Sequence, residues 1–103
     1  SAANAQARLI HLDSGRSVSL ASQVASRRIL VFVEHNCPAC LVYAHELATC
    51  SSAMRTRTDF VSKSSAAKSR LLKAHLPEGS ELYLIKPQVA VELGVHATPT
   101  TQV

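Results

Sequence analysis

The feature that most constrains this chain is an apolar run that passes directly into a pair of cysteines, in the segment ILVFVEHNCPAC. Residues 29–33 are five consecutive apolar residues, mostly β-branched or aromatic, which is typical of a central strand buried on both faces. Asn36 suits a turn, and Pro38 suits the first turn of a helix, where no backbone N–H is needed. An apolar stripe at helical spacing then follows at Leu41, Ala44, Leu47 and Ala48. The segment predicts a buried strand, a turn, and a helix whose start carries two cysteines.

The rest of the chain alternates between strand-like and helix-like patterns. Strands are predicted at residues 8–12 and 81–85, helices at 17–27, 59–76 and 87–93, and extended chain at 95–103. Ser17 or Ser19 can cap the first of these helices. The predicted order β-α-β-α-α-β-α-β indicates an α/β fold with helices layered on a sheet. We expect residues 1–7 to be a flexible N-terminal segment and residues 8–103 to form one domain.

The amino-acid composition argues against two kinds of interaction, with nucleic acid and across a membrane. The chain has 103 residues, of which 47% are hydrophobic and 17% are charged, so it can bury a modest core. No run approaches the ~20 apolar residues of a membrane span. The formal net charge of +4 comes from scattered Lys and Arg, and only two Tyr and two Phe are present to stack on bases. We therefore expect neither nucleic acid nor a membrane span among the partners.

The cysteines and a histidine allow a zinc alternative. Cys37, Cys40, His45 and Cys50 match the C-x2-C-x4-H-x4-C spacing of a zinc knuckle. However, if residues 38 to 52 are helical, Cys37 and Cys50 lie roughly 20 Å apart along the helix axis. Zinc holds its thiolate ligands at about 2.3 Å, and His45 would point about 140° away from Cys40. The spacers contain no glycine and favour a helix, so we expect no bound metal.

Thiol–disulfide chemistry requires only the first two cysteines of this segment, Cys37 and Cys40. In a C-x-x-C motif at a helix start, the two sulfurs sit one turn apart and can form a disulfide with little backbone movement. The first cysteine lies among unpaired backbone N–H groups at the positive end of the helix dipole, which stabilises its thiolate. Cys37 is therefore the predicted nucleophile that attacks a disulfide, and Cys40 the thiol that resolves the mixed disulfide. His35, two residues before Cys37, is a candidate to tune that thiol, or a plain turn histidine.

A second motif near the end of the chain completes a family resemblance. Residues 29–40 and the segment VELGVHATPT are similar to the two halves of a thioredoxin-fold active site. In that family a proline, normally cis, faces the C-x-x-C motif from a loop before a strand, and Pro99 matches it. The resemblance implies that Thr98 and Pro99 pair with an extended substrate beside the disulfide. It also implies a thioredoxin-like three-layer fold, most similar to bacterial periplasmic disulfide isomerases and Dsb-type proteins.

The chain departs from the family pattern in two places. Thioredoxins carry a buried acidic residue and a Trp where this chain has Val31 and Asn36, which leaves Glu34 and His35 as candidates to assist Cys40. Only four residues follow Pro99, so the resemblance implies that the C-terminal strand and helix of the fold are lacking or truncated.

The sequence therefore predicts an enzyme, a thiol–disulfide oxidoreductase that needs no metal or organic cofactor. Its expected partners are proteins with thiols or disulfides and a redox partner protein, in the periplasm or secreted, or alternatively in the cytoplasm. The competing hypotheses are a non-enzymatic thioredoxin-like component of a secretion or conjugation system, and zinc-dependent nucleic-acid binding. We expect Cys50 to be a half-buried structural thiol or a third redox thiol, His45 to be a surface residue, and His96 to be a candidate substrate contact.

Overall fold

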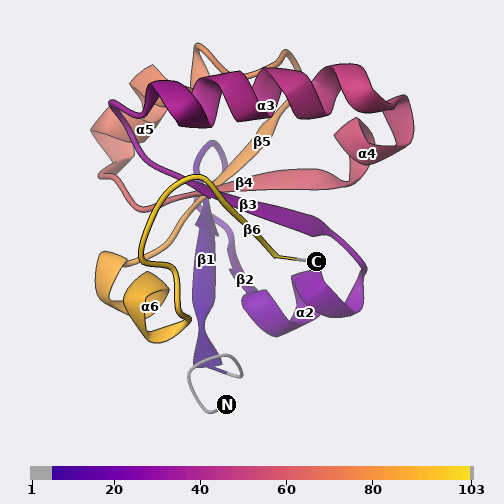
Figure 1. Ribbon diagram of the computed structural model, residues 1–103. Helices are drawn as coiled ribbons and strands as arrows, with labels where there is room; N and C mark the ends of the chain where they lie inside the picture. The colour runs from indigo at the N-terminus through magenta and orange to yellow at the C-terminus, as the bar shows by residue number, and fades with distance from the viewer. Residues whose placement is uncertain (1–5, 103) are drawn as a thin grey trace.

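The computed structural model describes residues 6–102, so most of the expected flexible segment lies outside the described residues. A six-stranded mixed sheet in the order β2-β1-β5-β4-β3-β6 forms the middle of the molecule (Figure 1). Its strands are β1 (Arg8–His11), β2 (Ser17–Ser19), β3 (Ile29–Val33), β4 (Thr58–Ser62), β5 (Glu81–Leu84) and β6 (Thr100–Gln102). Ala7, just before β1, is already buried and its carbonyl accepts from the Leu20 N–H, so packing begins one residue before the expected boundary.

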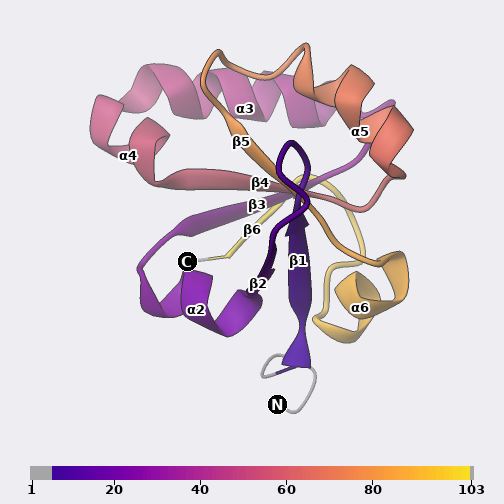
Figure 2. The same ribbon diagram turned by 180° about the vertical axis from the view of Figure 1, so that it is seen from behind.

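Helices cover both faces of this sheet, as Figures 1 and 2 show from opposite sides. The helices are α2 (Leu20–Ala25), α3 (Pro38–Cys50), α4 (Ser52–Arg57), α5 (Ala66–Lys73) and α6 (Pro87–Glu92). α3, α4 and α5 lie on one side of the sheet, and α2 and α6 lie on the other. The three-layer α/β arrangement predicted from the sequence is confirmed. No helix within residues 6–102 has the length and apolar character needed to cross a membrane.

Strand β3 is the centre of the core, as its continuous apolar run predicted. All five of its residues are buried. Ile29, Val31 and Val33 pack in the cluster beneath α3 and α5, whereas Leu30 and Phe32 pack in the cluster on the α2 and α6 side. β3 runs parallel to β4 and antiparallel to β6. Because each fully buried side chain of this kind contributes roughly 1.5–3 kcal/mol, both faces anchor the strand that leads to the cysteines.

The helix predicted at residues 59–76 is wrong at residues 59–62, which belong to strand β4. Thr58–Ser62 is a fully buried strand, and the helix spans only Ala66–Lys73. Asp59 suggested a helix cap from the sequence, but in the fold it is a buried strand residue. Asp59 accepts from Arg28 and Gln23, and Ser62 pairs with Ser69.

Two shorter elements also differ from the predicted order. Residues 17–19 form strand β2, antiparallel to β1, so the helix predicted from residue 17 begins only at Leu20. Ser19 caps that helix by accepting from the Ser22 N–H at 3.0 Å. Helix α4 was not predicted. It forms because Ser51 ends α3 in an extended conformation and caps a new helix by accepting from the Met54 N–H at 3.0 Å.

Candidate active site

The turn between β3 and α3 places the first cysteine at a helix start. Asn36 has φ 60°, in the left-handed region that asparagine tolerates better than most residues. Cys37 is the N-cap of α3, and its Sγ accepts from the Cys40 N–H at 3.1 Å. Pro38 occupies the first helical turn, where a missing N–H costs nothing. The predicted strand, turn and helix are therefore present, and they direct the Cys37 sulfur to the positive end of a 13-residue helix.

Cys37 and Cys40 are joined by a disulfide, with their Cα atoms 5.2 Å apart. Cys40 is fully buried in the core cluster under α3, whereas Cys37 is only partly buried. An external sulfur can therefore reach Cys37 more easily than Cys40. This asymmetry suits the roles of nucleophile and resolving thiol, which stay predictions for these two residues.

The loop before β6 faces the same disulfide. The Thr98–Pro99 peptide bond is cis, and both the carbonyl oxygen and the Oγ1 of Thr98 lie 3.7 Å from the Cys37 Sγ. In the reduced protein the hydroxyl can donate to a Cys37 thiolate, while the carbonyl can only accept from a thiol. The structure brings Thr98 and Pro99 to the cysteine pair across 61 residues of sequence. Their contact with substrate stays a prediction.

Glu34 and His35, the two candidates for tuning the thiols, lie on the turn but differ in surroundings. Glu34 forms an ion pair with Lys63, with 3.4 Å between its Oε2 and the lysine Nζ. The backbone N–H of His35 donates to Ser64 Oγ at 2.8 Å. His35 also lines a pocket beside Cys37. Within residues 6–102, no hydrogen bond joins either side chain to a cysteine. A tuning role for Glu34 or His35 therefore stays a prediction.

Sequence reasoning missed three serines, Ser62, Ser64 and Ser69, that support this turn. Ser62 and Ser69 are fully buried and lie 2.7 Å apart at their hydroxyl oxygens. Ser62 Oγ accepts from the Ser64 N–H at 3.1 Å, and the Ser69 hydroxyl donates to the Ser64 carbonyl. The network holds the loop after β4 against the turn before Cys37. Serines in a stretch such as SKSSAAKS carry no sequence signal that separates these roles from ordinary loop residues.

The other residues singled out from the sequence lie away from the disulfide. Cys50 ends α3, at the opposite end of the helix from Cys37, and is exposed; the prediction of a half-buried thiol is wrong, because α3 turns this position to solvent. His45 is exposed, as predicted, and its Nε2 donates to the His75 carbonyl at 2.8 Å. His96 is exposed. The unbroken helix separates the residues of the alternative zinc spacing as the sequence argument required.

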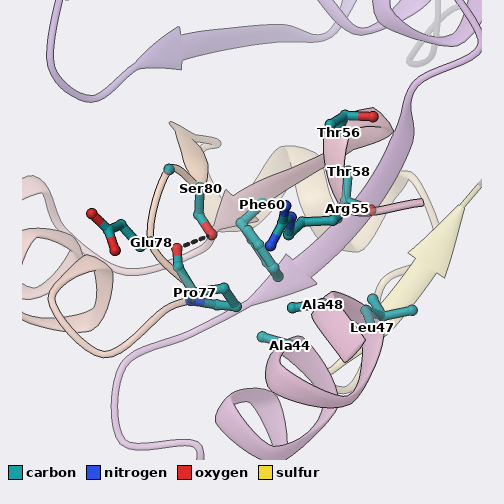
Figure 3. Close-up of a pocket in the computed structure, with 11 residues that line it drawn as sticks. Ala44, Leu47, Ala48, Arg55, Thr56, Thr58, Phe60, Pro77, Glu78 and Ser80 are labelled. Atoms are coloured by element: carbon teal, nitrogen blue, oxygen red, sulfur yellow. Dashed lines mark hydrogen bonds between the residues drawn. The ribbon is translucent and has the colours of Figure 1, made fainter. Parts of the chain in front are cut away.

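A second pocket lies toward the other end of α3 (Figure 3). It has a volume of about 370 Å³ and is bounded by residues of α3, α4, β4 and the loop at residues 77–80. Ala44 and Leu47 come from α3, and the Ser80 hydroxyl donates to the Pro77 carbonyl on the far wall. Neither cysteine of the disulfide lines this pocket, so it forms no part of the candidate active site.

Together, three features define a thioredoxin-like fold. They are the sheet with helices on both faces, the C-x-x-C disulfide at the start of α3, and the cis proline that faces this disulfide. A solved structure of MTB DsbF in its mixed oxidised and reduced forms is similar, with a TM-score of 0.70. The similarity covers 96% of this chain and 76% of that chain at 19% sequence identity, which establishes the fold. No protein-family model matches the chain, and no curated protein matches its sequence.

Proposed function

We propose that the protein is a thiol–disulfide oxidoreductase that acts on protein disulfides through Cys37 and Cys40. The observation that carries this proposal is the pairing of the two cysteines at the start of α3, with the Cys37 sulfur 3.7 Å from two polar atoms of Thr98. A purely structural disulfide would not need a partly accessible sulfur at the positive end of a helix. A reactive one does, because that position stabilises the thiolate that attacks or leaves.

The exchange balances without any cofactor. The Cys37 thiolate attacks a substrate disulfide, forms a mixed disulfide and releases one substrate thiolate. The Cys40 thiol then loses its proton to solvent or to a nearby base, and its thiolate attacks the Cys37 sulfur of the mixed disulfide. This second step forms the Cys37–Cys40 disulfide and releases the second substrate thiolate, so two electrons pass to the substrate. The reverse sequence oxidises a substrate dithiol, and a redox partner protein restores the starting state in either direction.

The extended backbone of a protein substrate fits beside Thr98 and Pro99. A cis proline presents the backbone of the residue before it, and an extended peptide can pair with that backbone while its sulfur meets Cys37. A periplasmic or secreted location is part of the proposal, since the disulfides of protein substrates form and persist in oxidising compartments. MTB DsbF was solved in mixed oxidised and reduced forms, which agrees with a redox-active role for the corresponding fold.

Single cysteine variants test the proposal. Cys37→Ser should abolish the reduction of insulin disulfides, whereas Cys40→Ser should accumulate mixed disulfides that a reducing gel resolves. Cys50→Ser is the matched control, because this exposed thiol lies at the far end of α3, and it should retain full activity. Undiminished turnover by Cys37→Ser would leave the chain as a scaffold rather than an enzyme.

A further inference from the structure

A pocket of about 360 Å³ adjoins the partly exposed sulfur of Cys37. Its walls come from two elements, the turn and first helical turn around Cys37, and the end of α5 with the loop that follows. Thr98 and Pro99 are not among the residues that line it. Cys37 therefore borders two different surfaces, the proline loop that suits a peptide backbone and a pocket that suits one side chain.

The lining of this pocket combines an apolar part with two imidazoles. Leu72 is almost completely buried and belongs to the core, and Leu41 is half-buried beside it. His35 and His75 are the two histidines that line it. A neutral imidazole donates one N–H and a protonated imidazole donates two, and no carboxylate lines the described pocket. The pocket is therefore suited to a group with a short apolar stem and a negatively charged end.

The position of His75 is fixed by bonds to its backbone rather than to its ring. The His75 N–H donates to the Leu72 carbonyl at 2.9 Å, and the His75 carbonyl accepts from His45 Nε2 at 2.8 Å. The first bond is local to the end of α5, and the second joins the loop after α5 to α3. His75 lines the pocket, and the bond from His45 ties its wall to α3.

We propose that this pocket binds a glutamate side chain of the substrate protein, next to the cysteine that Cys37 attacks. The methylene groups of the glutamate lie on Leu41 and Leu72, and its carboxylate accepts from His35 and His75. A lysine at the same place would bring a positive charge against two donors, in a chain whose net charge is already +4. This inference names the substrate class of the proposed exchange reaction and rests on that function.

Three disulfide-linked peptides that differ only in Glu, Gln or Lys before the cysteine test this assignment. With the reduced protein, kcat/KM should be about tenfold higher for the Glu peptide than for the Lys peptide, the value of one charge-assisted hydrogen bond of ~1.4 kcal/mol. His75→Leu removes one of the two donors and should lower this ratio. Lys68→Gln is the matched control, because it removes a full charge from exposed α5 outside the pocket and should leave the ratio unchanged.

A binding measurement separates this inference from the exchange reaction itself. The Cys37→Ser protein is titrated with the Glu and Lys peptides, each with Ser in place of Cys, while the imidazole signals are followed by NMR. The His75 signal should shift with the Glu peptide only. Equal turnover of all three peptides, or an unchanged ratio in His75→Leu, would overturn the inference. If no peptide is turned over, the proposed function fails and the titration alone decides whether the pocket binds glutamate.

Discussion

The two ends of the paired strands β3 and β4 are built from different chemistry. At the amino end, Asp59 is 1% exposed and accepts from Arg28 Nε and Nη2, each at 2.8 Å, and from Gln23 Nε2 at 2.9 Å. The hydrogen bonds that Arg28 donates to Asp59 raise the pKa of Arg28 above its ordinary value, so this cation keeps its proton in ordinary buffers. This end of the sheet is fixed by an ion pair in which Asp59 is buried and Arg28 is partly exposed.

At the carboxyl end, where the disulfide lies, the fully buried polar groups are neutral, and the ion pair between Glu34 and Lys63 is only partly buried. Ser62 ends β4 about 10 Å along the strand from Asp59, at ~3.3 Å per residue. It bonds to Ser69, and the same loop supplies Ser64 as the acceptor for the His35 N–H. A buried charge here would bias the ionisation of Cys40 directly. The comparison teaches that this chain keeps its buried charge pair at the end of the sheet remote from the sulfur chemistry.

Arg28→Met tests whether the two ends are independent, and it has the largest expected effect. Removing the cation leaves the Asp59 carboxylate buried without its partner, which should lower the free energy of unfolding by about 3 kcal/mol. The reduction potential of the Cys37–Cys40 pair should stay within about 10 mV, since well-separated sites act additively. Denaturant unfolding and equilibration with a glutathione buffer measure the two quantities. Arg27→Met, at the exposed neighbour, should cost less than about 0.5 kcal/mol.

Ser64→Ala sharpens the comparison at the carboxyl end. Losing the acceptor of the His35 N–H should lower the free energy of unfolding by about 1 kcal/mol and also loosen the turn before Cys37. Ser65→Ala, in the adjacent residue, removes the N-cap of α5, which accepts from the Lys68 N–H, and should cost about the same stability. Only Ser64→Ala should change the rate at which reduced Cys37 reacts with an alkylating reagent. Equal rates in both variants would contradict a link between the serine loop and the thiol.

Thr98→Val has a smaller expected effect, confined to the sulfur. The variant keeps the size of the side chain but removes the hydroxyl 3.7 Å from the Cys37 Sγ. Without this donor, the thiolate of reduced Cys37 should be less stable by about 0.5 kcal/mol, which lowers the thiolate fraction two- to threefold at a pH well below the pKa of the thiol. The ultraviolet absorbance of the thiolate measures that fraction. Thr98→Ser retains the hydroxyl and should behave as the parent, so a matching loss in that variant would exclude the hydrogen bond as the cause.

The comparison between the ends also explains which parts of the structure the sequence could predict. The apolar run at residues 29–33 and the cysteine motif are local signals, so the strand, the turn and the start of α3 followed from the residues themselves. Pro99 was connected to Cys37 only through a family resemblance, because nothing local links residues 61 positions apart.

Strand β4 could not be predicted for a related reason. Its polar side chains, Asp59 and Ser62, are acceptable in the interior only because Arg28 and Ser69 meet them there, and a pattern of single residues does not show such pairs. For the same reason, the contacts of Ser64 with His35 and of His75 with His45 could not be predicted from the sequence. The prediction for Cys50 was wrong in the opposite direction. Its apolar residue type suggested burial, but it lies where the helix faces solvent.

The smallest expected effect belongs to an ion pair on the surface, which contrasts with the buried pair of Arg28. The hydrogen bond from Lys73 lowers the pKa of Asp13 below its ordinary value of 3.8. A group whose pKa is lower in the folded protein adds stability above its unfolded pKa and loses it as the pH falls through the folded pKa. Lys73→Gln should therefore unfold at slightly lower urea than the parent at pH 7, and the difference should disappear as the pH falls through the lowered pKa of Asp13.

Salt gives the control for this last pair, because exposed charges are screened and the buried Arg28–Asp59 pair is screened much less. At about 1 M salt, the small difference between Lys73→Gln and its parent should disappear at pH 7 as well, while the loss caused by Arg28→Met remains. A Lys73→Gln difference that persists in acid or in high salt would show that Lys73 stabilises the fold through its packed hydrocarbon stem. Burial of charge would then not explain the difference between the two pairs, and the packing of the lysine side chain would have to be included.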